Sequence, residues 1–380
     1  DYTEQLFQPL PLNSEPVMQT PNKNTVCNEA QSPVSQVAFL SVQDILDLVA
    51  KIGMEAFLKG LAKYIKDDFR RWETFDKSPR FAAHSPEGVI ELMPTSDGQK
   101  FSFKYVNGHP KNTQKGLQTV TAFGVLADAD SGYPLMLSEM TVLTALRTSA
   151  TSALMATYLA PANSQSMALI GNGAQSEFQA FAFRTLLGIN TLRLYDVDTN
   201  ASEKCKANLS VYGFDVTICA TPEEAVKGVD IITTCTADKR NATILTSAMV
   251  KDGVYINAIG GDCPGKTELD KALLLRADVF VEYEEQTRIE GDIQQLSRDF
   301  SVTEMHRVIN GEAKGRTSPA QLIIFDGVGF AIEDFSALRY VYQLMTQHLP
   351  LKELELIATP KDPRNLFGLF ARSTTIRKVG

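Results

Sequence analysis

The stretch that decides the fold of this chain is Met167-Ala-Leu-Ile-Gly171-Asn-Gly173-Ala-Gln-Ser176. A short apolar strand is predicted to lead directly into a glycine-rich turn, and a helix is predicted to follow. Gly171 permits a tight turn, and Gly173 lets backbone amides approach a pyrophosphate at the positive end of the helix. Ser176 replaces the third glycine of such turns, a change that a small side chain allows. This strand–turn–helix pattern predicts a dinucleotide-binding site.

An acidic residue follows where such a site contacts the ribose. The predicted second strand, Thr191–Tyr195, ends immediately before Asp196, about 25 residues beyond the turn. A carboxylate there accepts hydrogen bonds from both ribose hydroxyls and repels a 2′-phosphate, so we expect NAD rather than NADP. The alternative is that Asp196 caps a helix, but Asp198 fits that role better.

The pattern around this motif changes near residue 139. A helix is expected over Glu139–Leu159, ending before Pro161. Beyond it, short apolar strands alternate with helices, which is typical of a doubly wound parallel sheet. The expected strands are Met167–Ile170, Thr191–Tyr195, Val216–Cys219, Ile231–Cys235, Tyr255–Ile259 and Val279–Glu282.

The sequence before this region predicts a helix followed by antiparallel strands. Ser41-Val-Gln-Asp44 resembles a capping box at a helix start. Two hairpins are expected, one from Val89 to Val106 and one from Thr119 to Leu137. A late helix, about Glu333–His348, is expected to return to this part of the fold.

We therefore predict an α/β fold with two domains, one of which is interrupted by the other. The predicted units are an N-terminal arm, disordered or draped on the surface, over 1–36, a discontinuous α+β substrate-binding and dimerisation domain over 37–145 and 329–380, and a Rossmann-type, doubly wound NAD-binding domain over 146–328.

Composition excludes several classes of protein. The 380 residues carry a net charge of −8, which argues against a protein that coats nucleic acid or an anionic membrane. No apolar run approaches the roughly 20 residues that span a bilayer. The five cysteines are scattered and form no C-x-x-C pair, so neither a disulfide scaffold nor a metal site is predicted. We expect a cytoplasmic protein.

Charged residues on predicted strands form a first candidate cluster. Lys104 is expected on the strand face opposite Phe101 and Phe103, within a largely apolar strand. Lys104 and Arg80, converging from neighbouring strands, would make a clamp for a carboxylate. Glu91 is either a structural partner of these cations or an acid/base group.

A second cluster lies after a strand of the parallel sheet. The loop Gly260–Lys266 follows the predicted strand Tyr255–Ile259, and ligands of such sheets bind beyond the carboxyl ends of strands. Asp262 is placed there to act as a base, or else forms an Asx turn. Cys263 lacks a histidine to activate it. Arg147, on an otherwise apolar helix, either makes a surface salt bridge or reaches the cofactor phosphates.

Five segments together resemble the ornithine cyclodeaminase/mu-crystallin family, over about residues 40–345: Arg80–Pro94, Phe103–Pro110, Ala168–Phe178, Gly260–Leu269 and Glu282–Gln295. The resemblance implies an NAD-binding Rossmann domain and a homodimer formed through the sheet of the other domain. It implies that Arg80 and Lys104 hold a substrate carboxylate, that Glu91 and Lys104 take part in catalysis, and that Asp262 is the general base.

The resemblance also implies contacts at both ends of the site. Val328 is expected to touch the substrate. Where the family pattern has a serine, this chain has Gly327, so a side-chain contact to the nicotinamide is expected to be absent there. The residues expected to bind NAD⁺ are Thr119, Arg147, Gly171, Gly173, Ala174, Gln175, Asp196, Thr236, Ala258, Ile259, Gly260 and Lys266.

The activity implied by this resemblance is conversion of L-ornithine to L-proline and ammonia, with NAD⁺ regenerated in each turnover. Three alternatives remain open: a lysine cyclodeaminase, an amino-acid dehydrogenase or ketimine reductase of the same fold, and a non-catalytic ligand-binding protein like mu-crystallin. One methylene distinguishes ornithine from lysine, and a pocket gains only about 1–3 kcal/mol from such a difference.

Overall fold

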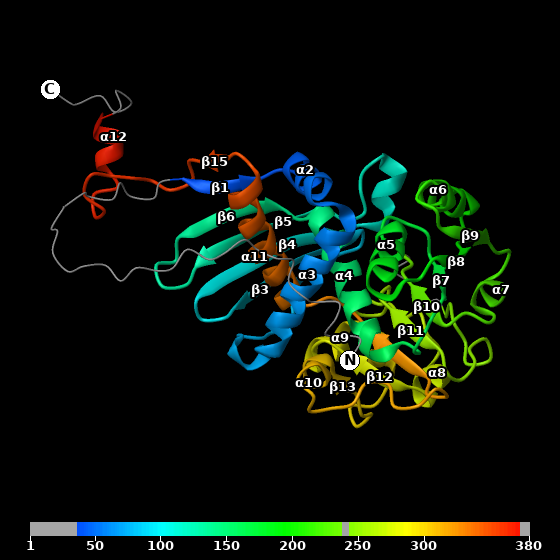
Figure 1. Cartoon of the computed structure of the whole chain (residues 1–380). Coiled ribbons are helices and arrows are strands. Elements are labelled where there is room, and N and C mark those ends of the chain that lie inside the picture. The colour runs from blue at the N-terminus through cyan, green and yellow to red at the C-terminus, as the bar shows by residue number, and fades with distance from the viewer. Residues whose placement is uncertain (1–35, 238–242, 373–380) are drawn as a thin grey trace, which may run out of the picture.

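Two sheets organise the molecule, as the computed structural model shows for residues 36–237 and 243–372 (Figure 1). The first has seven strands in the order β15-β1-β6-β5-β4-β3-β2. Its neighbours pair antiparallel except β1 and β6, which pair parallel. The strands are β1 (Val37–Leu40), β2 (Phe81–Ser85), β3 (Gly88–Ser96), β4 (Lys100–Gly108), β5 (Ala122–Asp128), β6 (Pro134–Glu139) and β15 (Glu353–Leu354).

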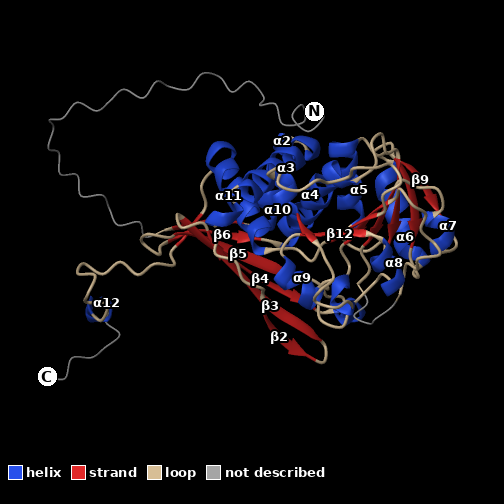
Figure 2. Cartoon of the chain, turned by 90° about the horizontal axis from the view of Figure 1, so that it is seen from below, coloured by secondary structure: helices blue, strands red, loops and turns tan. Residues whose placement is uncertain are grey.

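Helices cover one side of this sheet and leave the other side open (Figure 2). These helices are α2 (Val42–Ile52), α3 (Met54–Arg70) and α11 (Ala331–His348). Helix α2 begins with the predicted capping box, because Ser41 accepts a hydrogen bond from the Asp44 amide and Asp44 accepts one from the Ser41 amide. Helix α11 contacts α3 and β4, so the predicted return of the late helix is confirmed.

The strand β4 fixes which side chains meet those helices. Ser102, Lys104 and Val106 are buried, whereas Phe101 is exposed and Phe103 is half-buried. The alternation predicted for this strand is therefore confirmed, with the lysine on the helix side and the aromatic rings on the open side.

The second sheet has eight strands, all parallel, in the order β13-β12-β14-β11-β10-β7-β8-β9. It confirms the predicted doubly wound Rossmann-type sheet, whose strand order reverses between β7 and β10. The strands are β7 (Ser166–Ile170), β8 (Thr191–Tyr195), β9 (Asp215–Ile218), β10 (Ile231–Thr234), β11 (Tyr255–Ala258), β12 (Asp278–Val281), β13 (Thr303–Glu304) and β14 (Ile323–Asp326).

Helices bury both faces of this second sheet. Met167 and Leu169 of β7 belong to one apolar cluster, and Ala168 and Ile170 belong to another on the opposite face. The helices of this part of the chain are α4 (Thr141–Leu159), α5 (Ser176–Leu187), α6 (Thr199–Ser210), α7 (Pro222–Val226), α8 (Lys271–Arg276), α9 (Glu284–Glu290) and α10 (Met305–Ile309), and α12 (Gly368–Arg372) lies in the C-terminal segment.

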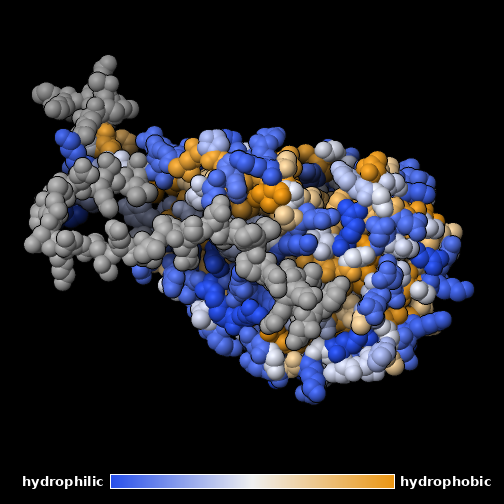
Figure 3. Space-filling model, in the orientation of Figure 1, coloured by the Kyte–Doolittle hydropathy of each residue, from blue (hydrophilic) through white to orange (hydrophobic). Residues whose placement is uncertain are grey.

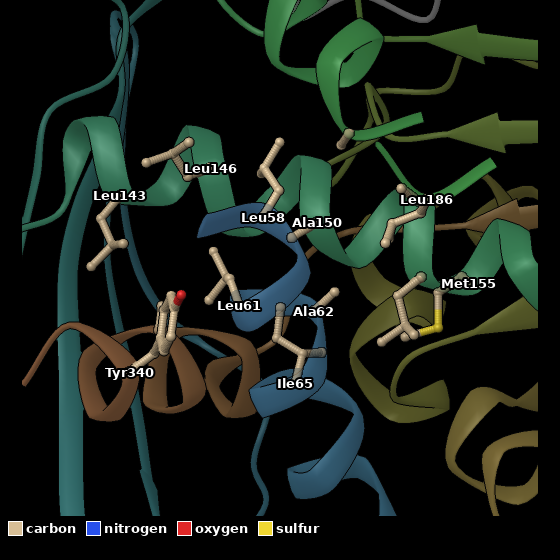
Figure 4. Close-up of a cluster of buried hydrophobic side chains, with 14 of the residues drawn as sticks. Leu58, Leu61, Ala62, Ile65, Leu143, Leu146, Ala150, Met155, Leu186 and Tyr340 are labelled. Carbon is tan, nitrogen blue, oxygen red and sulfur yellow. The ribbon is translucent and has the colours of Figure 1, made fainter. Parts of the chain in front are cut away.

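Helix α4 joins the two parts of the fold. It packs against both α3 and α5. Figure 4 shows apolar side chains from these helices and from α11 meeting along it; the labelled ones are Leu58, Leu61, Ala62, Ile65, Leu143, Leu146, Ala150, Met155, Leu186 and Tyr340. Apolar packing thus continues across α4 from one part of the fold into the other. The predicted domain boundaries at residues 146 and 328 stay a prediction.

Three expectations about the elements need correction or addition. Glu139 ends strand β6, and α4 begins at Thr141, because the Glu139 carboxylate accepts a hydrogen bond from the Val142 amide at the helix start. Strand β14 was not predicted, although it lies between β11 and β12. The short strands β1, β13 and β15 were also not predicted, since four residues or fewer give little periodicity.

On the face of the molecule drawn in Figure 3, the residues that are not grey form a mixed surface, with hydrophobic residues scattered among hydrophilic ones. Among the described helices, none is long and apolar enough to cross a membrane. The predicted N-terminal arm, 1–36, lies outside the described residues except for its last position.

Candidate active site

The glycine turn lies where the strand order reverses. Gly171 has a φ of 93°, and a Cβ there would stand 2.8 Å from the carbonyl oxygen of Cys235. Gly173 has nothing within 4 Å of its Cβ position, so this side of the turn is open. Ala174 and Gln175 complete the turn, and α5 begins at Ser176. Only glycine fits at the first position, and the second leaves room for a phosphate to approach the backbone.

Asp196 lies just beyond β8 and beside this turn. Its Oδ2 accepts a hydrogen bond of 2.6 Å from the Asn172 amide, and its Oδ1 accepts one from the Asp198 amide. Asp198 caps α6 by accepting a hydrogen bond from the Asn200 amide, as expected. Asp196 also borders a pocket of about 290 Å³, whose lining residues are Tyr195, Asp196, Thr199, Ser202, Ile218, Cys219 and Ala220.

These features fit a bound dinucleotide. The open glycine turn accepts a pyrophosphate, and the pocket bordered by Asp196 has room for the adenosine end. The carboxylate of Asp196 still has lone pairs for ribose hydroxyls, since each of its oxygens accepts one backbone hydrogen bond and can accept a second.

The ends of β10 and β11 hold the next predicted residues. Ala258 ends β11 and is buried, and Ile259 and Gly260 follow it. Lys266 donates a 2.8 Å hydrogen bond to the Thr236 carbonyl and pairs with Asp262 at 3.3 Å. The side chain of Asp262 is 53% exposed, whereas that of Lys266 is buried. The predicted base therefore faces open space beside a fixed cation.

Arg80 enters the site from the loop before β2. Its Nη1 lies 3.1 Å from Glu91, and its Nε lies 2.9 Å from Glu290 at the end of α9. Its Nη2 donates 2.7 Å hydrogen bonds to the carbonyls of Val328 and Gly329. The guanidinium thus joins both sheets and brings Glu91 and Val328 into one cluster.

The charge of Asp262 also acts on this cluster. Burial lowers the pKa of Arg80, but the charges of Glu91, Glu290 and Asp262 together raise it above its ordinary value. Burial raises the pKa of Glu290 to about 7, against the opposing effect of Arg80. Glu290 was not singled out from the sequence, because its partner lies far away in the chain.

Lys104 and Arg147 meet at the start of α11. Lys104 Nζ lies 2.8 Å from Oδ1 of Asp334, and Arg147 Nε lies 2.9 Å from the same oxygen. Arg147 Nη1 also lies 2.7 Å from Glu333. The first turn of a helix favours such carboxylates. Arg147, predicted to reach the cofactor phosphates, is therefore buried in ion pairs beside Lys104.

Burial shifts the pKa values of Lys104 and Glu333. It lowers the pKa of Lys104 to about 8, an effect that the charge of Arg147 strengthens and that of Asp334 opposes. It also raises the pKa of Glu333 to about 8, against the charge of Arg147. Lys104 is thus a cation that titrates close to neutral pH.

Thr119 and Gly327 are two further positions for which the sequence gives an expectation about contacts to the cofactor. Thr119 lies in the loop before β5, where its carbonyl accepts a hydrogen bond from the His109 amide, and within the described chain none of its hydrogen bonds reaches the second sheet. A Cβ at Gly327 would lie 2.7 Å from the ring of Phe325 and 3.2 Å from Ile259. A serine there would require both neighbours to move, which gives a physical reason for the departure from the family pattern.

The chain is similar to known proteins over most of its length. The sequence model of the ornithine cyclodeaminase/mu-crystallin family matches residues 42–348. The chain belongs to this family. The ornithine cyclodeaminase of Agrobacterium fabrum is 60% identical over 344 residues, which cover 90% of this chain and 97% of that protein.

Solved structures of the family share the fold. A lysine cyclodeaminase, described with L-lysine, L-ornithine and L-2,4-diaminobutyric acid, superposes with a TM-score of 0.82 at 28% identity, covering 87% of this chain and 98% of that one. An archaeal alanine dehydrogenase, a dimer with bound NAD, superposes with a TM-score of 0.78 at 28% identity, covering 85% of this chain and all of that one.

Proposed function

We propose that this protein is an ornithine cyclodeaminase that converts L-ornithine to L-proline and ammonia and uses NAD⁺ catalytically. The observation that carries the proposal is the exposed Asp262, whose partner Lys266 binds the carbonyl of Thr236 beside the glycine turn. The charge of Asp262 acts on Arg80, and the charge of Arg80 acts on Lys104, so the two cations lie within reach of the same site. The 60% identity to ornithine cyclodeaminases over 90% of the chain supports it.

Arg80 and Lys104 orient the substrate by its carboxylate. The side chains of both cations are buried, so an anion beside them gains more than it would in water. Held there, the substrate presents its Cα to the cofactor side of the site. When bound, NAD⁺ supplies the hydride acceptor and later the hydride donor for that carbon. Glu91 keeps Arg80 in place through its ion pair.

Asp262 acts on the other end of the substrate. Its exposed carboxylate attracts the δ-ammonium of ornithine and takes one proton from it. The freed amine attacks C2 of the oxidised substrate, the C2–N bond to the original amino group breaks, and ammonia leaves. Lys266, fixed to the Thr236 carbonyl, holds Asp262 toward the substrate.

The rival activities are less well supported. The lysine cyclodeaminase of Streptomyces rapamycinicus is 28% identical, against 60% for the ornithine enzymes. A reductase of a preformed cyclic imine has no distal amine for Asp262 to deprotonate. A non-catalytic binding protein has no need of Arg80, Glu91, Lys104 and Asp262 together.

A homodimer formed through the first sheet is also part of the proposal. The open face of that sheet carries exposed apolar side chains, at Phe81, Ile90, Leu92, Phe101 and Phe123. Such a contiguous patch is typical of a protein interface. The dimer described for the archaeal relative supports a second copy of this chain as the partner. We place the enzyme in the cytoplasm, in keeping with cysteines that are scattered along the sequence and form no C-x-x-C pair.

The experiment is a product analysis with ornithine, lysine and alanine side by side, each with catalytic NAD⁺. Ornithine should give proline and ammonia without accumulation of NADH. Asp262→Asn should lower proline formation by about 100-fold or more while NAD⁺ still binds, because general-base catalysis contributes about 10²–10⁴-fold. Stoichiometric NADH without proline would contradict the proposed activity.

A further inference from the structure

Three buried carboxylates lie beneath the site and take no part in the proposed chemistry. Glu268, Asp292 and Asp326 are each 1% exposed or less. They belong to the chain after β11, to the segment after α9 and to the end of β14. A buried carboxylate is costly unless hydrogen bonds satisfy it, so their partners indicate what they do.

Asp326 and Asp292 each accept a hydrogen bond from the backbone amide of the next of these residues. Asp326 accepts hydrogen bonds of 3.0 and 2.9 Å from the amides of Asp292 and Ile293. Asp292 Oδ1 in turn accepts bonds of 2.8 and 2.9 Å from the amides of Glu268 and Leu269. We call these three residues the carboxylate ladder. It runs from the end of β14 toward the ends of β10 and β11.

Glu268 is the last rung, and it binds the two strand ends nearest the predicted base. Its Oε1 accepts a 2.9 Å hydrogen bond from the Thr236 amide and another from the Thr236 hydroxyl. Its Oε2 accepts a 3.1 Å bond from the Gly260 amide. A Cβ at Gly260 would lie 2.0 Å from Glu268 Oε1, so the backbone there rests directly against the carboxylate.

The same strand end also anchors the partner of Asp262. Lys266 donates to the carbonyl of Thr236, whose amide and hydroxyl are bound to Glu268. Moving Thr236 would therefore move the Lys266 ammonium, which lies 3.3 Å from Asp262. Gly260, the other residue bound to Glu268, is only two positions before Asp262 in the chain.

We propose that Glu268 is a positioning residue for the reaction, which sets the ends of β10 and β11 and, through Thr236 and Lys266, the place of Asp262. This inference rests on the proposed cyclodeaminase activity. Loss of Glu268 should slow turnover more than it weakens substrate capture, because the carboxylate clamp of Arg80 and Lys104 lies on other elements.

The test is Glu268→Gln, with Asp270→Asn as its matched control. The glutamine keeps the shape but has one acceptor oxygen, so it cannot bind both Thr236 and Gly260. Asp270, two residues later, caps α8 through the Leu273 amide and also binds the Ser247 amide, away from the site. We expect E268Q to lower kcat about tenfold or more with the ornithine KM within about threefold, and D270N to leave both unchanged.

A second pair of variants covers the case in which E268Q does not fold. Asp292→Ala removes both bonds to the backbone of Glu268 and should lower kcat in the same way. Asp292→Asn should lose less, because both bonds go to Oδ1, and Oδ2 has no hydrogen-bond partner among the described residues. Unchanged kcat in E268Q and D292A, or an equal loss of kcat in D270N, would overturn the inference. A wild-type enzyme that makes no proline would instead overturn the proposed activity.

Discussion

At the scale of single residues, the proposed site depends on Lys104, whose side chain loses its charge not far above neutral pH. Burial lowers the pKa of Lys104 to about 8, so the ammonium that we propose to bind the substrate carboxylate is lost as the pH rises through that value. We predict that kcat/KM for ornithine falls about tenfold per pH unit above about 8. The measurement is the pH profile of kcat/KM for the wild type and for Lys104→Arg.

Arginine stays charged throughout this range, so the fall near pH 8 should be absent from the K104R profile. The lower overall activity expected from the bulkier side chain does not affect the comparison, since only the shape of the profile is tested. A profile with the same fall in both enzymes would assign the titration to the substrate amine.

The sequence predicted the local part of the site and missed its ionic partners. Gly171, Gly173 and Asp196 belong to one strand–helix–strand unit, which short-range rules describe well. The partner of Lys104 is 230 residues away in the chain, and that of Arg147 is 186 residues away. Such pairs follow from tertiary packing, which neither spacing nor periodicity in one sequence encodes.

At the scale of elements, the capping box of α2 offers a separate test of stability. Ser41 accepts a hydrogen bond from the Asp44 amide at the helix start, far from the charged cluster. Ser41→Ala should lower the free energy of unfolding by about 0.5–2 kcal/mol and leave kcat unchanged. Chemical denaturation measures the loss, with the exposed Gln43→Ala in the same turn as the control. Equal stability of S41A and wild type would show that the cap contributes nothing.

Strand β14 is the longest strand of the second sheet that the sequence did not predict. Strand β14 is a continuous apolar run in the middle of a parallel sheet, with both faces buried, so it lacks the alternation that reveals a strand at a surface. Strand β10 is also buried on both faces, but it was predicted because the sequence alternates strands with helices around it. The segment 310–322 before β14 forms no helix or strand, so this alternation is interrupted there.

At the scale of the whole molecule, the open face of the first sheet is the interface that we propose for a dimer. Leu92 is 45% exposed and lies across from Tyr105 and Phe81 on that face. Leu92→Glu should convert the proposed dimer to a monomer, because it places a charge in the apolar interface. Sedimentation measures the change, with Leu275→Glu, exposed on α8, as a control. A dimeric L92E would exclude this face as the interface.

The helix α11 has a consequence for how the enzyme is made. The carboxylates that neutralise Lys104 and Arg147 lie at its start, at Glu333 and Asp334, although the two cations are translated much earlier. A chain still being synthesised carries both cations without these partners until most of it has left the ribosome. We therefore expect the charged cluster to be completed only late in translation, and we expect fragments that stop before α11 to be inactive even where the dinucleotide turn has formed.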